Sequence, residues 1–314
     1  SKLMHLAADL LTANGCPEIM SNSLTKGAYY EGLQVCRAER CVRILNPLSA
    51  DLNVMRQTLL FNMLEAVALN ANRKNGDLSL YEFGNCYFYD ADRRADENPL
   101  AAYSEEYRLA IAVTGLSEPQ SWNVKPEKAS FFTLRAVAEK LLRRFGIDIY
   151  ALKTEPLASD LFGEGLSMSL GNKELLQIGT VGSGIRRRFD VKQEVYFLEM
   201  NFDALVKSTK KHKIAAEELS KFPEVKRDLA LLVDRQVTFA ALREVAFATE
   251  RKLLKSVSLF DVYEGDKLPE GKKSYALSFI LEDKTRTLDE KTIERVMANL
   301  TAQFESRCGA TVRS

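Results

Sequence analysis

The order of apolar segments in residues 221–314 constrains the fold of this chain more than any other feature. Strand-like alternation is expected at 228–233, 257–263 and 274–281, with a short last strand after Gly309. Helix-like spacing follows Thr238, and again the capping-box sequence Thr287-Leu-Asp-Glu290. The order strand, helix, strand, strand, helix, strand predicts a ferredoxin-like βαββαβ domain.

Residues 1–206 show a different pattern, in which amphipathic helices are interspersed with strands. The helices are expected at 3–11, 55–68 and 131–145. The strands are expected at 78–89, 109–113, 167–170, 175–181 and 195–200. Together they predict an α+β domain built on a sizeable mixed or antiparallel sheet.

A polar segment, residues 207–220, separates these two predicted domains. Lys207, Lys210, Lys211 and Lys213 crowd together there while the apolar content drops. Such a lysine run is typical of a solvated segment, and an RNA contact is the alternative. We therefore predict a linker at 207–220 between domains of 1–206 and 221–314.

The composition removes several classes of function. The chain has 314 residues, a net charge of +1, two histidines and five cysteines without paired spacing. We expect neither a metal site nor a catalytic triad, and we expect reduced thiols in a cytoplasmic protein. No apolar run approaches the roughly 18 residues of a membrane helix. The first predicted helix starts beside Ser1, so we expect a piece of a longer protein.

The sheet of a ferredoxin-like domain has helices on one face, which leaves the other face open to a ligand. Alternation along the third strand points Tyr275, Leu277, Phe279 and Leu281 at the helices. Ser274, Ala276 and Ser278 then line the open face. On the second strand, Phe260 and Val262 are expected to face inward, and Asp261 and Tyr263 outward.

An aromatic ring, a carboxylate and a hydroxyl at one end of an exposed sheet suit a splayed-out nucleotide. The ring of Tyr263 would stack on the base, while Asp261 and Ser274 would bind its edge. Lys226 and Arg227 before the first strand, and Lys272 and Lys273 before the third, would flank this platform and meet phosphates. Edge packing of Tyr263 and a turn cap at Asp261 are the alternative interpretations.

Longer motifs carry a resemblance to a known family. In the C-terminal domain these are Phe222–Val233, Leu259–Gly265, Leu268–Ser274 and Arg286–Leu288. They resemble the ferredoxin-fold anticodon-binding domain that ends the β subunit of bacterial phenylalanyl-tRNA synthetase. Upstream, Asn46–Arg56, Leu80–Gly84 and Trp122 with Phe131-Phe132 resemble the catalytic-like domain that precedes it in that subunit.

This resemblance implies a fold, partners and site residues. The fold is a degenerate class II synthetase-like antiparallel-sheet domain followed by the ferredoxin-like domain. The partners are a catalytic α subunit and phenylalanine tRNA, whose anticodon base stacks on Tyr263 beside Asp261 and Ser274. Arg286, from the matching Arg-Thr-Leu segment, joins the candidate RNA contacts. ATP and Mg²⁺ belong to the parent complex, and this chain is expected to bind no cofactor and to be inactive alone.

One departure from a working class II core supports that expectation. Such a core needs an arginine two residues before the strand glutamate to hold ATP phosphate, and here Leu80 precedes Glu82. Gly182–Arg187 only imitates the second nucleotide-binding segment, and Arg135-Ala136 replaces the Lys-Gly usual in the family. Two alternatives stay open: an active class II ligase, and a ferredoxin-like small-molecule regulatory module fused to a degenerate ligase core.

Overall fold

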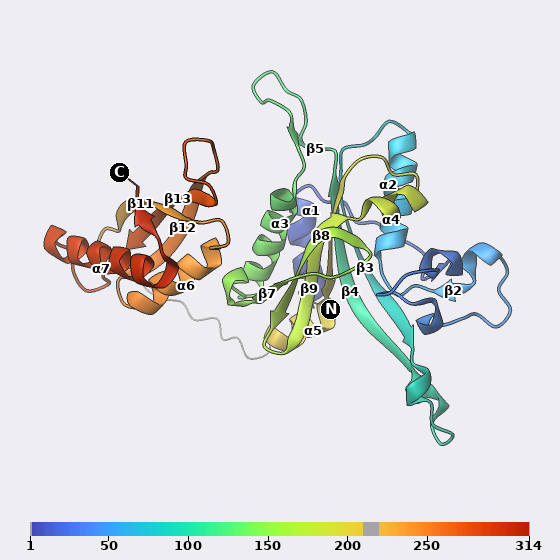
Figure 1. Cartoon of the computed structure of the whole chain (residues 1–314). Helices are drawn as coiled ribbons and strands as arrows, with labels where there is room; N and C mark the ends of the chain where they lie inside the picture. Colours follow the sequence, from blue (N-terminus) through green and yellow to red (C-terminus); the bar gives the residue numbers. More distant parts are fainter. Residues whose placement is uncertain (1, 210–219, 314) are drawn as a thin grey trace. The chain divides into compact units, whose positions relative to one another are not determined.

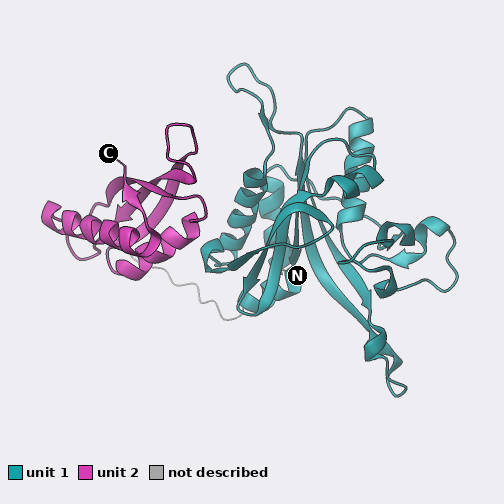
Figure 2. Cartoon of the chain, in the orientation of Figure 1, with its two compact units in different colours: residues 1–214 teal, residues 215–314 magenta. Residues whose placement is uncertain are grey.

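The computed structural model describes residues 2–209 and 220–313. The chain forms two compact units, residues 1–214 and 215–314 (Figure 2). The predicted linker, 207–220, contains this division, and its residues 210–219 lie outside the described part of the chain. No described helix is long and apolar enough to cross a membrane.

The first unit contains five α-helices and ten strands among its described residues. The helices are α1 (Lys2–Ala13), α2 (Leu60–Asn72), α3 (Phe131–Arg144), α4 (Ser183–Arg188) and α5 (Phe202–Thr209). The strands are β1 (Leu24–Thr25), β2 (Val54–Met55), β3 (Leu78–Tyr89), β4 (Tyr103–Thr114), β5 (Leu116–Glu118), β6 (Glu127–Lys128), β7 (Lys153–Pro156), β8 (Phe162–Leu170), β9 (Lys173–Val181) and β10 (Val195–Asn201).

A six-stranded antiparallel sheet in the order β3-β4-β10-β9-β8-β7 organises this unit (Figure 1). Helices α1, α3 and α5 pack on one face, and α2 and α4 pack on the other. Because both faces are covered, the central strand β4 is apolar and buried almost without interruption from Leu109 to Val113. The predicted α+β fold with a sizeable sheet is confirmed.

The helix predicted at 55–68 begins later than expected. Met55 belongs to strand β2, where it pairs with Leu24, and α2 starts only at Leu60. The apolar stripe of this helix is fully buried: Leu59, Leu60, Met63, Leu64 and Val67 have no exposed surface. The stripe therefore forms internal core and does not provide an outer surface for a partner.

The second unit confirms the ferredoxin-like prediction. Its elements are β11 (Val225–Asp234), α6 (Phe239–Thr249), β12 (Leu254–Tyr263), β13 (Lys272–Leu281), α7 (Glu290–Cys308) and β14 (Thr311–Val312). The strands form one antiparallel sheet in the order β12-β13-β11-β14 (Figure 1). Side chains of α6 and α7 and of one sheet face form a single core around Leu277, Phe279 and Phe304.

Helix caps in this unit agree with the sequence except at one position. Thr238 caps α6 by accepting a hydrogen bond from the Ala241 backbone N–H, as predicted. The predicted capping box at Thr287 is wrong, because Asp289 is the residue directly before α7 and its carboxylate accepts from Thr292 at 2.7 Å. Gly309 ends α7 in the left-handed conformation, with φ of 60°.

Candidate nucleic-acid interface

The sheet face of the second unit that lies opposite α6 and α7 is called the open face below. Residues directly paired across antiparallel strands share a face, so the register identifies its members. One row across the sheet is Thr311, Leu232, Ser274 and Tyr263. The next is Arg313, Ala230, Ala276 and Asp261, in which the Arg313 backbone N–H donates to the Ala230 carbonyl at 2.9 Å. A third is Asp228, Ser278 and Ser258. Between Arg313 and Asp261, the two central strands contribute only the small side chains of Ala230 and Ala276.

The structure brings three of the predicted site residues together on the open face, near the end of β12. Tyr263 pairs with Ser274, and Asp261 pairs with Ala276 in the neighbouring row. Asp261 is exposed, Tyr263 is half-buried, and Ser274 is only 5% exposed. The register thus places all three side chains on the open face, as expected from alternation. Their contact with RNA stays a prediction.

Two neighbours hold the ring of Tyr263. The backbone of Gly265 lies against its phenol end, so close that a Cβ there would come within 2.4 Å of Oη. The guanidinium carbon of Arg313 lies 5.4 Å from the ring centroid, within cation–π range. Arg313 was missed from the sequence because it follows a two-residue strand whose pairing partner is not apparent from the sequence alone.

A β-bulge changes the predicted direction of Phe260. The register shifts between Leu259, which pairs with Leu277, and Asp261, so Phe260 is the extra residue. Its side chain is 58% exposed, and Lys226 Nζ lies 5.7 Å from its ring centroid. Because β13 separates their strands, this contact requires both side chains to be on the open face. The predicted inward orientation of Phe260 is therefore wrong.

Val262, the other residue predicted to face inward, is not a core residue either. It pairs with the buried Tyr275 but is itself 47% exposed. The buried apolar positions of β12 are instead Leu254 and Val257, each 6% exposed. Simple alternation did not predict Leu254 and Val257 as core residues, because it assumes one register along the whole strand. Strand β12 has two register shifts.

Two of the predicted cations lie on the face that the helices cover. Arg227 pairs with the buried Phe279, and its Nη2 donates to both carboxylate oxygens of Glu290 at 2.7 and 2.9 Å. Lys273 pairs with the buried Val233 and is 8% exposed. Its Nζ lies 4.6 Å from the Tyr275 ring centroid. Neither side chain flanks the open face as expected.

Besides Lys226, which lies beside Phe260, two predicted cations remain, and they lie at opposite ends of the sheet. Lys272 falls on the open face by alternation from Ser274, and its Nζ lies 2.8 Å from Asp234 Oδ1. Arg286 follows the far end of β13 and contacts Asp283 at 3.4 Å. Ser274 and Leu281 are seven residues apart, which is about 24 Å along an antiparallel strand. Arg286 is therefore remote from Tyr263.

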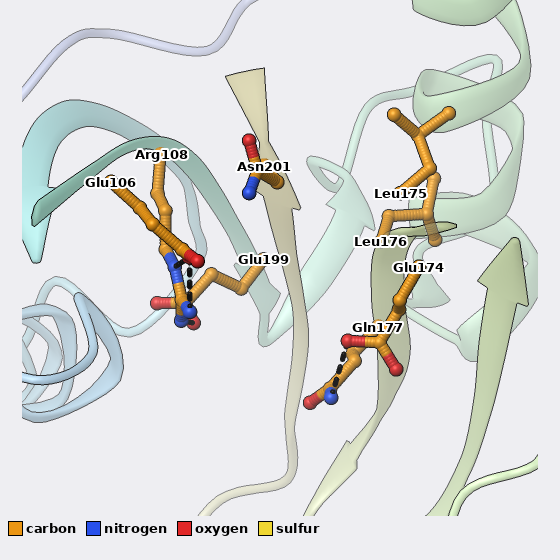
Figure 3. A pocket seen from close by; sticks show the side chains of 8 residues that line it. All are labelled: Glu106, Arg108, Glu174, Leu175, Leu176, Gln177, Glu199 and Asn201. Atoms are coloured by element: carbon orange, nitrogen blue, oxygen red, sulfur yellow. Dashed lines mark hydrogen bonds and ion pairs between the residues drawn. The ribbon is translucent and has the colours of Figure 1, made fainter. Parts of the chain in front are cut away.

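In the first unit, a cavity of about 180 Å³ lies on the sheet face next to the start of α2 (Figure 3). Arg108 bonds Glu199 at 2.5 Å and Glu106 at 2.7 Å. The other oxygen of Glu199 accepts from Thr58 Oγ1 and from the Leu59 backbone N–H. Burial alone would lower the pKa of Arg108, but Glu199 and then other neighbouring acidic groups raise it above its usual value. Arg108, Glu106 and Glu199 thus pair with one another, while Glu174 on the cavity wall accepts hydrogen bonds from the neutral side chains of Ser167 and Gln177.

Glu82, two residues after the predicted clamp position Leu80, forms a buried ion pair with Arg56. Glu82 is 1% exposed and accepts from Arg56 Nη1 at 2.8 Å. Ser21 donates to the same carboxylate from its backbone N–H and from its hydroxyl. Leu80, where the clamp arginine would be, is 5% exposed. Glu82 is thus buried and paired within the unit, and the absence of ATP binding stays a prediction.

The glycine-rich imitation of a nucleotide-binding segment has a structural role. Gly182 precedes α4, and Arg186 donates to the backbone carbonyls of Val181, Lys192 and Gln193, the last at 2.6 Å. These bonds tie the two ends of the loop around α4 together. Among the described residues, no group of three histidine, cysteine, aspartate or glutamate side chains is arranged to bind a metal ion.

Comparison with known proteins matches each unit to a family model. Residues 1–202 match the family model described as the phenylalanyl tRNA synthetase beta chain CLM domain. Residues 220–313 match the ferredoxin-fold anticodon binding domain. Among solved structures, a pyrrolysyl tRNA synthetase from Desulfitobacterium hafniense is similar with a TM-score of 0.50 and 14% identity, covering 67% of this chain and 68% of that one. At this identity the likeness concerns the fold alone.

Curated relatives match along the whole chain. The phenylalanine–tRNA ligase beta subunit of Bacteroides thetaiotaomicron is 48% identical over 314 residues, which is all of this chain and 38% of that subunit. The same subunit of Porphyromonas gingivalis is 44% identical over 313 residues, again 38% of its length. The chain thus spans little more than a third of the relatives that it matches.

Proposed function

Because the chain belongs to the phenylalanyl-tRNA synthetase beta chain family, we propose that it binds the anticodon region of phenylalanine tRNA through its second unit. The match to an anticodon-binding domain over residues 220–313 supports this proposal. The observation that carries it is the convergence of Tyr263, Asp261 and Ser274 on the open face. A sheet of this kind presents a ring for stacking and polar groups for a base edge.

The chemistry of the three side chains defines the kind of base they accept. An ionised carboxylate only accepts hydrogen bonds, so Asp261 favours a base edge that presents amino or imino N–H groups. The Ser274 hydroxyl can both donate and accept hydrogen bonds, and the residue is nearly buried in the sheet. Tyr263 supplies sequence-tolerant stacking energy of about 1–3 kcal/mol. Discrimination between bases therefore falls to Asp261 and Ser274.

We further propose that the first unit has no catalytic role and packs on the catalytic α subunit, which supplies the ATP and Mg²⁺ site. The buried Arg56–Glu82 ion pair supports the first part. Exposed apolar side chains support the second: Met20, Leu45, Leu48 and Trp122 are each at least 90% exposed. Exposed apolar and aromatic groups of this kind are enriched at partner contacts.

Binding of the phenylalanine tRNA anticodon stem-loop to the full chain tests the central proposal. We expect the chain to bind this stem-loop and Tyr263→Ala to weaken the binding. A stem-loop with an unrelated loop sequence should bind with lower affinity. ATP–pyrophosphate exchange should be absent for the chain alone. If the second unit bound free phenylalanine and no RNA, the regulatory-module alternative would replace this proposal.

A further inference from the structure

The open face presents a second aromatic ring next to the proposed nucleotide site. Phe260 is 58% exposed, and its neighbours by register on this face are small or polar: Ser258 pairs with Ser278, and Asp261 pairs with Ala276. These neighbours provide little apolar surface on which the ring could pack. We propose that Phe260 and Lys226 form a second stacking position, which takes the nucleotide adjacent to the one on Tyr263. This inference rests on the proposed anticodon binding.

The bulge in β12 is what makes two stacking positions possible on one strand. Without it, strict alternation would put Phe260 and Tyr263, three residues apart, on opposite faces of the sheet. The extra residue brings Asp261 and Tyr263 to the open face, which also carries the Phe260 ring and Lys226, on either side of the intervening strand β13. Phe260 and Tyr263 are then three residues apart on the same face, about 10 Å along the strand. This spacing suits two unstacked, consecutive bases of single-stranded RNA.

Each of the two rings has a cation beside it. Lys226 Nζ lies 5.7 Å from the Phe260 centroid, and the Arg313 guanidinium lies 5.4 Å from the Tyr263 centroid. Surfaces that bind single-stranded nucleic acid combine stacking rings with cations that meet the backbone phosphates. A base on each ring would place its phosphates within reach of these two flexible side chains. The repeated ring-and-cation pair favours RNA over a protein surface as the occupant.

An unsatisfied hydroxyl lies in the same part of the open face. Ser278 is 4% exposed, and its Oγ has no hydrogen-bond partner within the described chain. Such buried orphan groups are uncommon in folded proteins, and each calls for an explanation, of which a partner bound from outside the chain is one. Ser278 pairs with Ser258, two residues before Phe260. A nucleotide on Phe260 would therefore sit next to the group that needs a partner.

The test measures binding of the full chain to the anticodon stem-loop and to versions with one abasic nucleotide at each loop position. Phe260→Ala and Phe260→Leu should each weaken binding roughly 5-fold or more. A roughly 5-fold loss is the lower limit of the effect expected when one stacked base is lost. Phe260→Tyr should bind like the parent, because it keeps the ring. Val262→Ala is the matched control, since Val262 is an exposed apolar residue of the same strand whose partner is the buried Tyr275.

Abasic substitution identifies the occupant of each ring. We expect one abasic stem-loop to which Phe260→Ala and the parent bind with equal affinity, because the base that would stack on Phe260 is missing. The abasic stem-loop on which Tyr263→Ala has no effect should be missing the adjacent base. If Tyr263→Ala weakens binding while Phe260→Ala is neutral at every position, this inference fails and anticodon binding stands. If neither variant changes binding, the proposed function itself fails. Loss of α-subunit association in Phe260→Ala with RNA binding intact would make the ring a protein contact and overturn the inference.

Discussion

The phenol end of Tyr263 lies directly against the backbone of Gly265, where a Cβ would come within 2.4 Å of Oη. Gly265 follows the end of β12 by two residues, so the chain turns back under its own last side chain. The absence of a side chain at position 265 thus decides where the ring rests. Arg313 contacts the same ring from β14's end of the open face.

Replacement of Tyr263 by alanine should weaken binding of the anticodon stem-loop by roughly 5- to 150-fold, the equivalent of about 1–3 kcal/mol of stacking. Tyr263→Phe should keep most of the affinity, because stacking requires the ring more than the hydroxyl. The core of this unit, with Leu277 and Phe279 fully buried, does not depend on Tyr263. Thermal unfolding should therefore show both variants folded. Unchanged affinity in a folded Tyr263→Ala variant would mean that the ring is edge packing.

Gly265→Ala should reduce affinity without removing any RNA-contacting group. The added Cβ would overlap the phenol end of Tyr263 and push the ring from its present position. The clash is with a movable side chain, so we expect stability close to the parent and an affinity between those of the parent and Tyr263→Ala. Gly271→Ala is a useful comparison: a Cβ there meets no atom within 4 Å, although its φ of +77° makes alanine strained. An affinity equal to the parent in Gly265→Ala would contradict the proposed ring position.

Lys272→Ala should flatten the salt dependence of RNA binding. One lost phosphate contact on single-stranded RNA reduces the slope of log K against log salt by about 0.7. The effect on affinity at one salt concentration should be modest, because Lys272 must first leave Asp234, 2.8 Å away. Arg286 lies at the other end of the sheet, so Arg286→Ala should keep the parent slope if the contact is confined to the neighbourhood of Tyr263. Stem-loop titrations at two or more salt concentrations measure both slopes.

The buried pair Arg56–Glu82 should be a strong determinant of the stability of the first unit. Both side chains are at most 3% exposed and lie 2.8 Å apart. Arg56→Met leaves a buried carboxylate without its cation and should cost about 3–5 kcal/mol of the free energy of unfolding. The double variant Arg56→Met/Glu82→Gln should lose less than the sum of the single changes, because neither charge is then left alone. Urea unfolding of all three variants measures this coupling, and strict additivity would show that the pair is not coupled.

Thiol reactivity should follow burial and pH. Burial raises the pKa of Cys36 to about 12, and it raises the pKa of Cys86 well above its usual value. Because the reactive species is the thiolate, both cysteines should stay protonated and unreactive toward a disulfide reagent at pH 8 in the folded protein. Cys308, which is only partly buried, should react first. In urea all five cysteines should react; fast reaction of Cys36 in the native state would contradict its buried position.

Local patterns in the sequence were sufficient for most of the second unit. Period-two and period-3.6 spacing, the cap at Thr238 and the stop at Gly309 each predict an element that the structure contains. The helix-facing row on β13, Tyr275 to Leu281, follows from alternation because that strand pairs with β11 in one continuous register. Tyr263, Asp261 and Ser274 were placed together by the same argument. Their side chains are within a few residues of a regular strand end, where alternation holds.

Only the tertiary structure determined the features that depend on contacts between distant segments. The bulge that lets Phe260 share the open face with Asp261 and Tyr263 is a mismatch between two strands, so no single strand's pattern contains it. Arg313 reaches Tyr263 only because β14 pairs with β11. Arg227 and Lys273 lie on the helix-covered face because their pairing partners are core residues. The pairing of Glu82 with Arg56 joins residues 26 positions apart. The sequence alone determines which secondary structure each segment prefers, because those preferences are local. The direction and the partners of a charged or aromatic side chain are set by the energy of packing one segment on another.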